Sequence, residues 1–135
     1  NSALLIGVDL RKDVTRLHAA YNDKAGVTAA FNLNVLERIN RELGGNFDLD
    51  TFAHEARWVP EPGRIEMHLV SEKMQDVTLG GETFHFKAGE SIHTEDSYKY
   101  DVAGFKALAA EAGWDSIECW IDPDELFSIH LLRVG

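Results

Sequence analysis

The chain has 135 residues, 44% of them hydrophobic, which is enough to form one compact domain with a core and argues against disorder. Thirteen basic against 23 acidic residues give a net charge of −10, which excludes electrostatic attraction to nucleic acid or to an anionic membrane. The charge therefore favours a small molecule or a protein as the partner.

The first predicted element is a strand over residues 3–8, an unbroken apolar run that ends at Asp9. Such a run is typical of a strand buried on both faces, as in parallel sheets. A strand of this kind needs neighbours on each side, so we expect an internal strand of a larger sheet whose earlier part is missing here. An unpaired first strand also favours self-association of this fragment.

Two helices are predicted next. Asp13 is a suitable N-cap for a helix over residues 14–21. Apolar residues at three- and four-residue spacings predict an amphipathic helix over residues 26–43, which the glycine pair 44–45 ends. A short third helix, capped by a nearby aspartate, is predicted over residues 51–54.

Within the second helix Asn32 and Asn34 are unusual, because asparagine side chains compete for backbone hydrogen bonds. We expect one of the two to face a ligand or the sheet.

From residue 58 the period of the apolar residues changes to two, which predicts strands. We expect an antiparallel meander over residues 58–97, with a two-residue turn at Gly80-Gly81. A helix over residues 102–112 follows, and then two strands over residues 116–121 and 126–132.

Residues 89–99 are rich in acids and hydroxyl groups. If they form a strand, Ser91, His93, Glu95 and Ser97 share one face, because side chains repeat every second residue. A row of hydrogen-bonding groups is costly to bury, so it favours contact with a polar ligand. The alternative is a solvated edge strand.

Two architectures are interleaved in this order of elements. Residues 1–10 and 101–135 resemble the tail of a nucleotide-type α/β sheet, whereas residues 11–100 have the pattern of an insertion with its own helices and small sheet. In an α/β sheet such an insertion lies beyond the carboxyl end of the first strand, where ligands bind. The fold class is therefore α/β, with α+β character within this chain.

Most chemical signatures are weak or absent. His93 and Glu95 have the spacing to ligate a metal with His68 or His85 across the sheet, but this signal is too weak to predict a metal site. Cys119 lies in an apolar strand pattern that favours inert packing, so we assign no catalytic residue. With one cysteine and no secretory segment, we expect a reducing cytoplasm. No glycine-rich cofactor loop follows a buried strand.

Seven stretches carry a resemblance to a known family. They are residues 4–10, 12–13, 20–23, 26–34, 39–44, 64–69 and 89–99. In this order they resemble the histidine-specific S-adenosylmethionine-dependent methyltransferases, which include the ergothioneine-pathway enzyme that trimethylates the α-amino group of histidine. The resemblance extends over nearly all of this chain but only over the C-terminal part of a family member.

The resemblance implies a fold and a cofactor. Residues 1–10 and 101–135 would be the tail of a Rossmann-like methyltransferase sheet, which a helical and antiparallel-sheet substrate-binding insertion, residues 11–100, interrupts. S-adenosylmethionine would be the methyl donor of the full-length protein. The missing N-terminal part, which carries the cofactor motif, would be the partner of this chain.

The resemblance also implies site residues. Tyr21 would contact the carboxylate or amine of the amino acid, Phe31 and Met67 would form apolar walls, and Glu95 and Ser97 would hydrogen-bond the imidazole. On pattern alone, Tyr21 is equally a residue at the core boundary, Phe31 and Met67 core residues, and Glu95 a solvated acid.

The hypothesis is the C-terminal part of an L-histidine α-N-methyltransferase that is inactive alone because it lacks the cofactor motif. The alternative is a stand-alone amino-acid-binding or regulatory module without the catalytic half, and a third possibility is a purely structural domain. Lys99 is expected to pair with a nearby acid, and such a pair at the surface would contribute little. His68, His85 and His93 receive no role.

Overall fold

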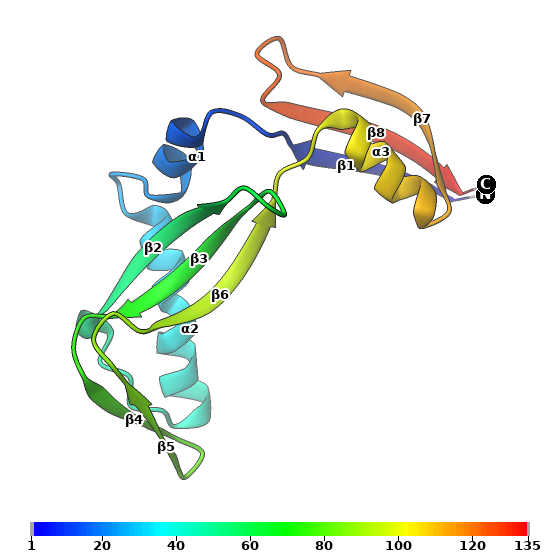
Figure 1. Cartoon of the computed structure of the whole chain (residues 1–135). Helices are drawn as coiled ribbons and strands as arrows, with labels where there is room; N and C mark the ends of the chain where they lie inside the picture. Colours follow the sequence, from blue (N-terminus) through cyan, green and yellow to red (C-terminus); the bar gives the residue numbers. More distant parts are fainter. Residues whose placement is uncertain (1, 135) are drawn as a thin grey trace.

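The computed structural model describes residues 2–134, which form two units joined by two segments of chain (Figure 1). The first unit consists of β1 (Ala3–Asp9), α3 (Val102–Glu111), β7 (Trp114–Ile121) and β8 (Phe127–Val134). The second unit consists of α1 (Val14–Tyr21), α2 (Val27–Leu43), the 3-10 turn η1 (Leu49–Thr51), β2 (Phe52–Val59), β3 (Arg64–Ser71), β4 (Gln75–Leu79), β5 (Glu82–Phe86) and β6 (Ser91–Tyr98). Within residues 2–134 no helix combines the length and the apolar character that a membrane span requires.

The first unit is a three-stranded sheet in the order β1-β8-β7, in which β8 is antiparallel to both neighbours. α3 packs on one face of this sheet through Phe105 and Ala109, which contact Val8 and Leu132. Within residues 2–134 the first strand is not buried on both faces as expected: Val8 is the one buried residue of β1, and Leu5 is 65% exposed. The physical reason is that, among the described residues, one helix covers one face.

Local signals place α1 and α2 correctly. The Asp13 carboxylate accepts hydrogen bonds from the backbone N–H groups of Thr15 and Arg16, so it caps α1 as predicted. α2 ends at Gly44, whose φ of 67° is the left-handed conformation that glycine adopts without strain. Both helices are confirmed within one residue of the predicted bounds.

The third predicted helix is wrong. After the short turn η1 the chain enters β2 at Phe52, so residues 52–54 are extended. Phe52 is 4% exposed and packs edge-to-face on Phe47, with the ring centroids 5.7 Å apart. Because burial of this ring against the core requires the strand, tertiary packing overrides the local capping signal.

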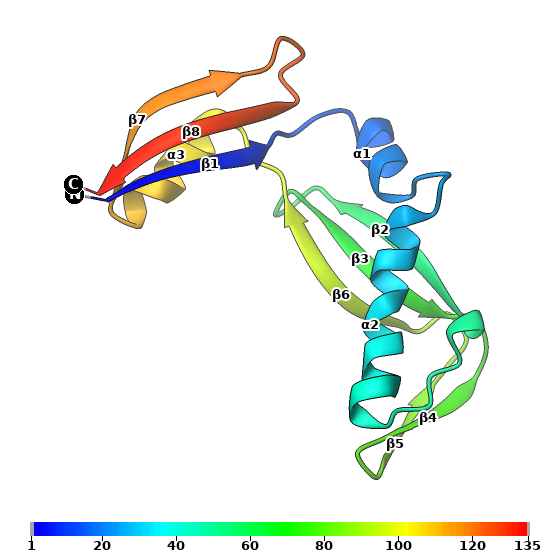
Figure 2. The same cartoon turned by 180° about the vertical axis from the view of Figure 1, so that it is seen from behind.

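The second unit has a three-stranded antiparallel sheet in the order β2-β3-β6, and β4 and β5 form a separate hairpin. The predicted continuous meander is therefore wrong, since the hairpin leaves the sheet and β6 returns beside β3. The turn at Gly80-Gly81 is confirmed, with φ of 60° and 85°. α1 and α2 contact this sheet, and α2 lies across one face of it, which we call the helix face (Figure 2).

A β-bulge divides β6 into two parts. Met67 pairs with Glu95 and His68 pairs with His93, so Thr94 has no partner in β3. Neighbouring residues of β3 point to opposite faces, and cross-strand partners share a face. The predicted single-faced row is therefore wrong: Glu95 and Ser97 lie on the helix face, whereas Ser91 and His93 lie on the opposite, outer face.

Candidate amino-acid site

The two segments that join the units run side by side. Leu10 and Tyr100 form a parallel β-bridge. The backbone N–H of Arg11 donates to the carbonyl of Tyr100 at 2.9 Å, and that of Tyr100 donates to the carbonyl of Asp9 at 3.2 Å. This pairing places the end of β1 beside the residue that follows β6, Lys99.

Lys99 is a buried cation with three hydrogen-bond acceptors. Its side chain is 1% exposed. The ammonium donates to Asp9 Oδ2 at 2.6 Å, to Tyr21 Oη at 2.6 Å and to Ser97 Oγ at 2.9 Å. We call Asp9, Tyr21, Ser97 and Lys99 the Lys99 cluster. Burial of an ammonium is tolerated only when such partners replace its water. The three hydrogen bonds therefore fix the positions of the side chains in the cluster.

Asp9 provides the negative charge of the Lys99 cluster. Its other carboxylate oxygen accepts a hydrogen bond from Lys12. Burial raises the pKa of Asp9, but the hydrogen bonds from Lys12 and Lys99 outweigh burial and hold this pKa below its usual value. Asp9 therefore remains a carboxylate opposite Lys99 at neutral pH.

Tyr21 reaches the cluster from the last turn of α1. It lies four residues after Leu17, which is buried, so both side chains lie on the α1 face that packs on the sheet. The ring packs against the core made by Leu17, Ala56 and Ile65, and the Lys99 ammonium lies 4.7 Å from its centroid. The Tyr21 hydroxyl lies 2.8 Å from Ser97 Oγ, so two predicted site residues meet.

Glu95 and Met67 lie beside this hydroxyl pair. Glu95 is two residues before Ser97 on the helix face and is the cross-strand partner of Met67. Met67 is 3% exposed, whereas Glu95 is exposed and makes no hydrogen bond within residues 2–134. The carboxylate of Glu95 is thus available to a ligand.

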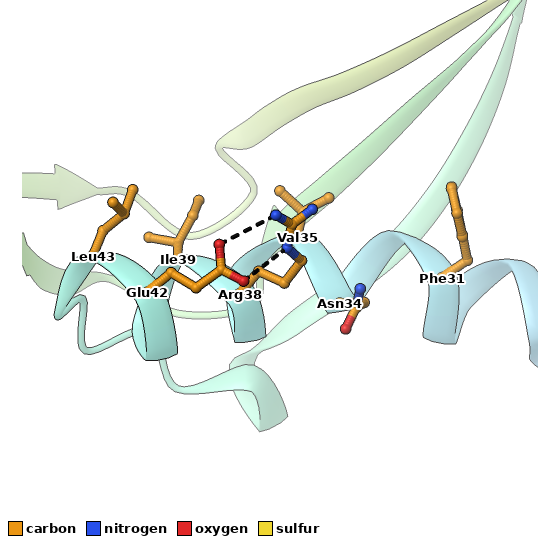
Figure 3. A pocket seen from close by; sticks show the side chains of 7 residues that line it. All are labelled: Phe31, Asn34, Val35, Arg38, Ile39, Glu42 and Leu43. Atoms are coloured by element: carbon orange, nitrogen blue, oxygen red, sulfur yellow. Dashed lines mark hydrogen bonds and ion pairs between the residues drawn. The ribbon is translucent and has the colours of Figure 1, made fainter.

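Phe31 lies apart from the Lys99 cluster, on the outer side of α2, where it is 63% exposed. It stands at one end of a groove of about 320 Å³ along this helix (Figure 3). The residues that line the groove are Phe31, Asn34, Val35, Arg38, Ile39, Glu42 and Leu43. The described residues therefore do not bring Phe31 to Tyr21 and Ser97.

Sequence reasoning gave Lys99 no role in the site and did not decide between Asn32 and Asn34. Lys99 does pair with an acid, Asp9, as expected, but the expected surface location is wrong because the Lys99 side chain is buried. The sequence did carry a signal for Lys99. It lies two residues after Ser97 and four after Glu95, which puts all three side chains on one face of an extended strand. The expectation that one asparagine faces the sheet is confirmed for Asn32, whose amide donates to the backbone carbonyl of His68.

The structure does not bring together His93 and Glu95 as metal ligands. Instead, His93 pairs with His68 on the outer face of the sheet. The rings of His68 and His93 stack at 4.8 Å, and Glu95 points to the other face. His68 Nε2 contacts Glu66 at 3.0 Å, and Arg64 contacts the same carboxylate at 2.5 Å. Hydrogen bonds from Arg64 and then His68 lower the pKa of Glu66 to about 2.

The outer-face ligand atoms of Glu66, His68 and His93 lie within 4.8 Å of one another. However, Glu66 already holds the Arg64 guanidinium, and His93 Nε2 is paired with Asp96 at 2.7 Å. A metal ion would have to displace these partners next to a fixed positive charge, so the arrangement is an ion-paired network. His85 lies elsewhere, on β5, where it contacts Asp76 at 2.6 Å.

Comparison with known proteins identifies similar chains. Residues 1–134 match the family model described as histidine-specific methyltransferase, SAM-dependent. The histidine N-alpha-methyltransferases of Mycolicibacterium smegmatis and Mycobacterium tuberculosis are each 46% identical over 131 residues, which is 96% of this chain and 41% of either relative. Ergothioneine biosynthesis protein 1 of Neurospora crassa is 30% identical over 135 residues, 98% of this chain and 15% of that protein. The chain thus spans about two-fifths of the length of the two mycobacterial relatives.

Proposed function

Because the chain belongs to the family of histidine-specific, S-adenosylmethionine-dependent methyltransferases, we propose that it carries the substrate-binding part of an L-histidine α-N-methyltransferase. The proposed protein works in the cytoplasm. We also propose a role in ergothioneine biosynthesis, the process that the name of the Neurospora relative gives. The observation that carries the proposal is the meeting of Tyr21 and Ser97 at 2.8 Å, beside the unpaired carboxylate of Glu95.

The proposed roles follow the chemistry of histidine. A neutral imidazole has one N–H donor and one nitrogen acceptor. Glu95 accepts from the ring N–H, and Ser97 makes the second hydrogen bond to the ring. Tyr21 contacts the carboxylate or the amine of the amino acid, and Met67 forms an apolar wall. A site built to pair these polar atoms rejects amino acids that lack them, because its own groups would be left unpaired.

Phe31, on α2, is the remaining residue of the proposed site and lies apart from the other four. It is 63% exposed in this chain, and a large exposed aromatic ring favours a partner surface. We propose that Phe31 contacts histidine as a second apolar wall in the intact protein.

The described residues do not form a cradle for S-adenosylmethionine. Gly7 is the one glycine of β1, and a Cβ at this position would lie 2.6 Å from the ring of Phe127, so the chain itself fills that space. The methyl donor, when bound in the intact protein, supplies the transferred methyl, and this chain positions the acceptor amine, which is a large part of the rate acceleration.

The proposed organisation assigns residues 1–10 and 101–135 to a Rossmann-like methyltransferase sheet and residues 11–100 to the insertion. Support comes from the sheet face that α3 leaves open, where Leu5, Trp120, Phe127 and Ile129 are between 41% and 65% exposed. An apolar face of this kind favours a covering partner. The proposed cover is the rest of the methyltransferase.

The test is an amino-acid panel. The intact protein is incubated with S-adenosylmethionine and each amino acid separately, and methylated products are identified by mass spectrometry. L-Histidine methylated at the α-amine is the expected product. Methylation of a different amino acid would remove the substrate assignment, and histidine binding without any methylation would favour a binding module. The chain of residues 1–135 alone is expected to transfer no methyl group.

A further inference from the structure

We propose that Lys99 is a positioning residue of the amino-acid site: its buried ammonium locks the Tyr21 and Ser97 hydroxyls into one unit that presents a single O–H donor to the substrate. This inference rests on the proposed function and deepens it. It assigns a role to a residue that touches no substrate and acts through two residues that do.

The first step is a count of protons. An ammonium has three N–H donors. Lys99 makes three hydrogen bonds, to Asp9, Tyr21 and Ser97, so all three of its protons are used. Each hydroxyl oxygen therefore accepts from Lys99 and must direct its own proton elsewhere.

The second step is the contact between the two hydroxyls. Tyr21 Oη and Ser97 Oγ are 2.8 Å apart, a hydrogen bond that uses one of their two protons. One proton is left. If Tyr21 donates to Ser97, then Ser97 donates outward; if Ser97 donates to Tyr21, the outward donor is Tyr21. The pair acts as one donor, and its second oxygen has no proton to offer.

The third step is the rigidity of this unit. The Lys99 side chain is 1% exposed, and charge-assisted hydrogen bonds are roughly twice as strong as neutral ones. The three partners come from β1, α1 and β6, so the ammonium also fixes how the second unit sits on the end of β1. Loss of the ammonium frees both hydroxyls to rotate and to accept from a ligand.

The test compares Lys99→Met with Lys73→Met in the intact protein. Both variants remove one ammonium and keep an unbranched side chain, but Lys73 is 54% exposed and contacts only Asp48 in its ion pair. We expect Lys99→Met to raise the KM for histidine about tenfold or more, with the KM for S-adenosylmethionine unchanged. Lys73→Met is expected to change neither. A histidine KM for Lys99→Met equal to that of the unaltered protein would overturn the inference.

A merely structural role gives a different result. It lowers the fraction of folded protein and hence the apparent kcat, but it leaves the histidine KM of the folded fraction unchanged. The inference is also separable from the proposed function, since the latter fails when the unaltered protein does not methylate histidine. In that case the same variants are measured with the amino acid that it does methylate.

A second measurement is available if Lys99→Met does not fold. Tyr21→Phe, Ser97→Ala and the double variant all keep Lys99. Each single variant retains one hydroxyl that accepts from Lys99 and donates outward, so the double variant is expected to raise the histidine KM by more than the product of the single effects. Single effects that multiply to the double effect would show two independent hydroxyls and contradict the inference.

Discussion

Asn32 in α2 and Thr94 in β6 are joined by a hydrogen bond of 2.6 Å from Thr94 Oγ1 to Asn32 Oδ1. Thr94 is the extra residue of the β-bulge that turns Glu95 to the helix face. The Asn32 amide also donates to the carbonyl of His68, on the strand beside the bulge, at 3.1 Å. One buried amide therefore couples the position of α2 to the orientation of Glu95.

The first prediction concerns this amide. Asn32→Ala removes the donor to the buried His68 carbonyl and one of the two acceptors of the half-buried Thr94 hydroxyl, so we expect it to lower the free energy of unfolding by about 1–3 kcal/mol. Asn34→Ala, two residues along the same helix but exposed, is the matched control and should change it by less than about 0.5 kcal/mol. Urea denaturation of both variants measures the difference. Equal stability of the two would contradict the role of Asn32.

The second prediction separates a ligand wall from a core residue. Phe31 is 63% exposed and Leu36, in the same helix, is 1% exposed. Leu36→Ala leaves a cavity and should cost about 2–5 kcal/mol of unfolding free energy, whereas Phe31→Ala should cost less than about 1 kcal/mol. In the intact protein Phe31→Ala should nevertheless raise the KM for histidine. A large loss of stability with an unchanged KM would make Phe31 an ordinary packing residue.

The third prediction concerns the pH dependence of stability. Hydrogen bonds from Arg64 and His68 hold the pKa of Glu66 at about 2 in the folded protein, below the 4.5 of the unfolded chain. A depressed folded pKa adds stability above pH 4.5, and this stability is lost as the pH falls towards about 2. The gap in unfolding free energy between the native protein and Glu66→Gln should therefore shrink over that range.

The measurement for this third prediction is urea denaturation in a series of buffers. Glu82→Gln is the control, since Glu82 is exposed on the β4–β5 hairpin. The difference in unfolding free energy between Glu82→Gln and the native protein should not change over the same range of pH. If the difference for Glu66→Gln is also independent of pH, the Arg64–Glu66 pair adds no stability.

Local features of this fold were predictable from the sequence. The Asp13 cap, the glycine end of α2 and the Gly80-Gly81 turn depend on residues a few positions apart, so their patterns are visible in the chain. The order of motifs also indicated the family that the comparison confirms.

The features that assemble the site were not predictable in the same way. Lys99 is buried because of Asp9, which lies 90 positions earlier, and the bulge at Thr94 is held by Asn32, 62 positions earlier. Strand alternation alone predicts His93 and Glu95 on one face. The unpaired residue between them, Thr94, reverses the alternation and places them on opposite faces. Long-range partners therefore decided what the local patterns could not.

The most direct test of the proposed amino-acid site is the KM for L-histidine of the intact protein and of its Glu95→Gln variant, at saturating S-adenosylmethionine. Glutamine keeps the shape of the side chain but removes the charge that accepts the imidazole N–H. We therefore expect the histidine KM to rise about tenfold or more and the KM for S-adenosylmethionine to stay unchanged. Glu82→Gln should match the unaltered protein. An unchanged histidine KM for Glu95→Gln would contradict the proposed amino-acid site.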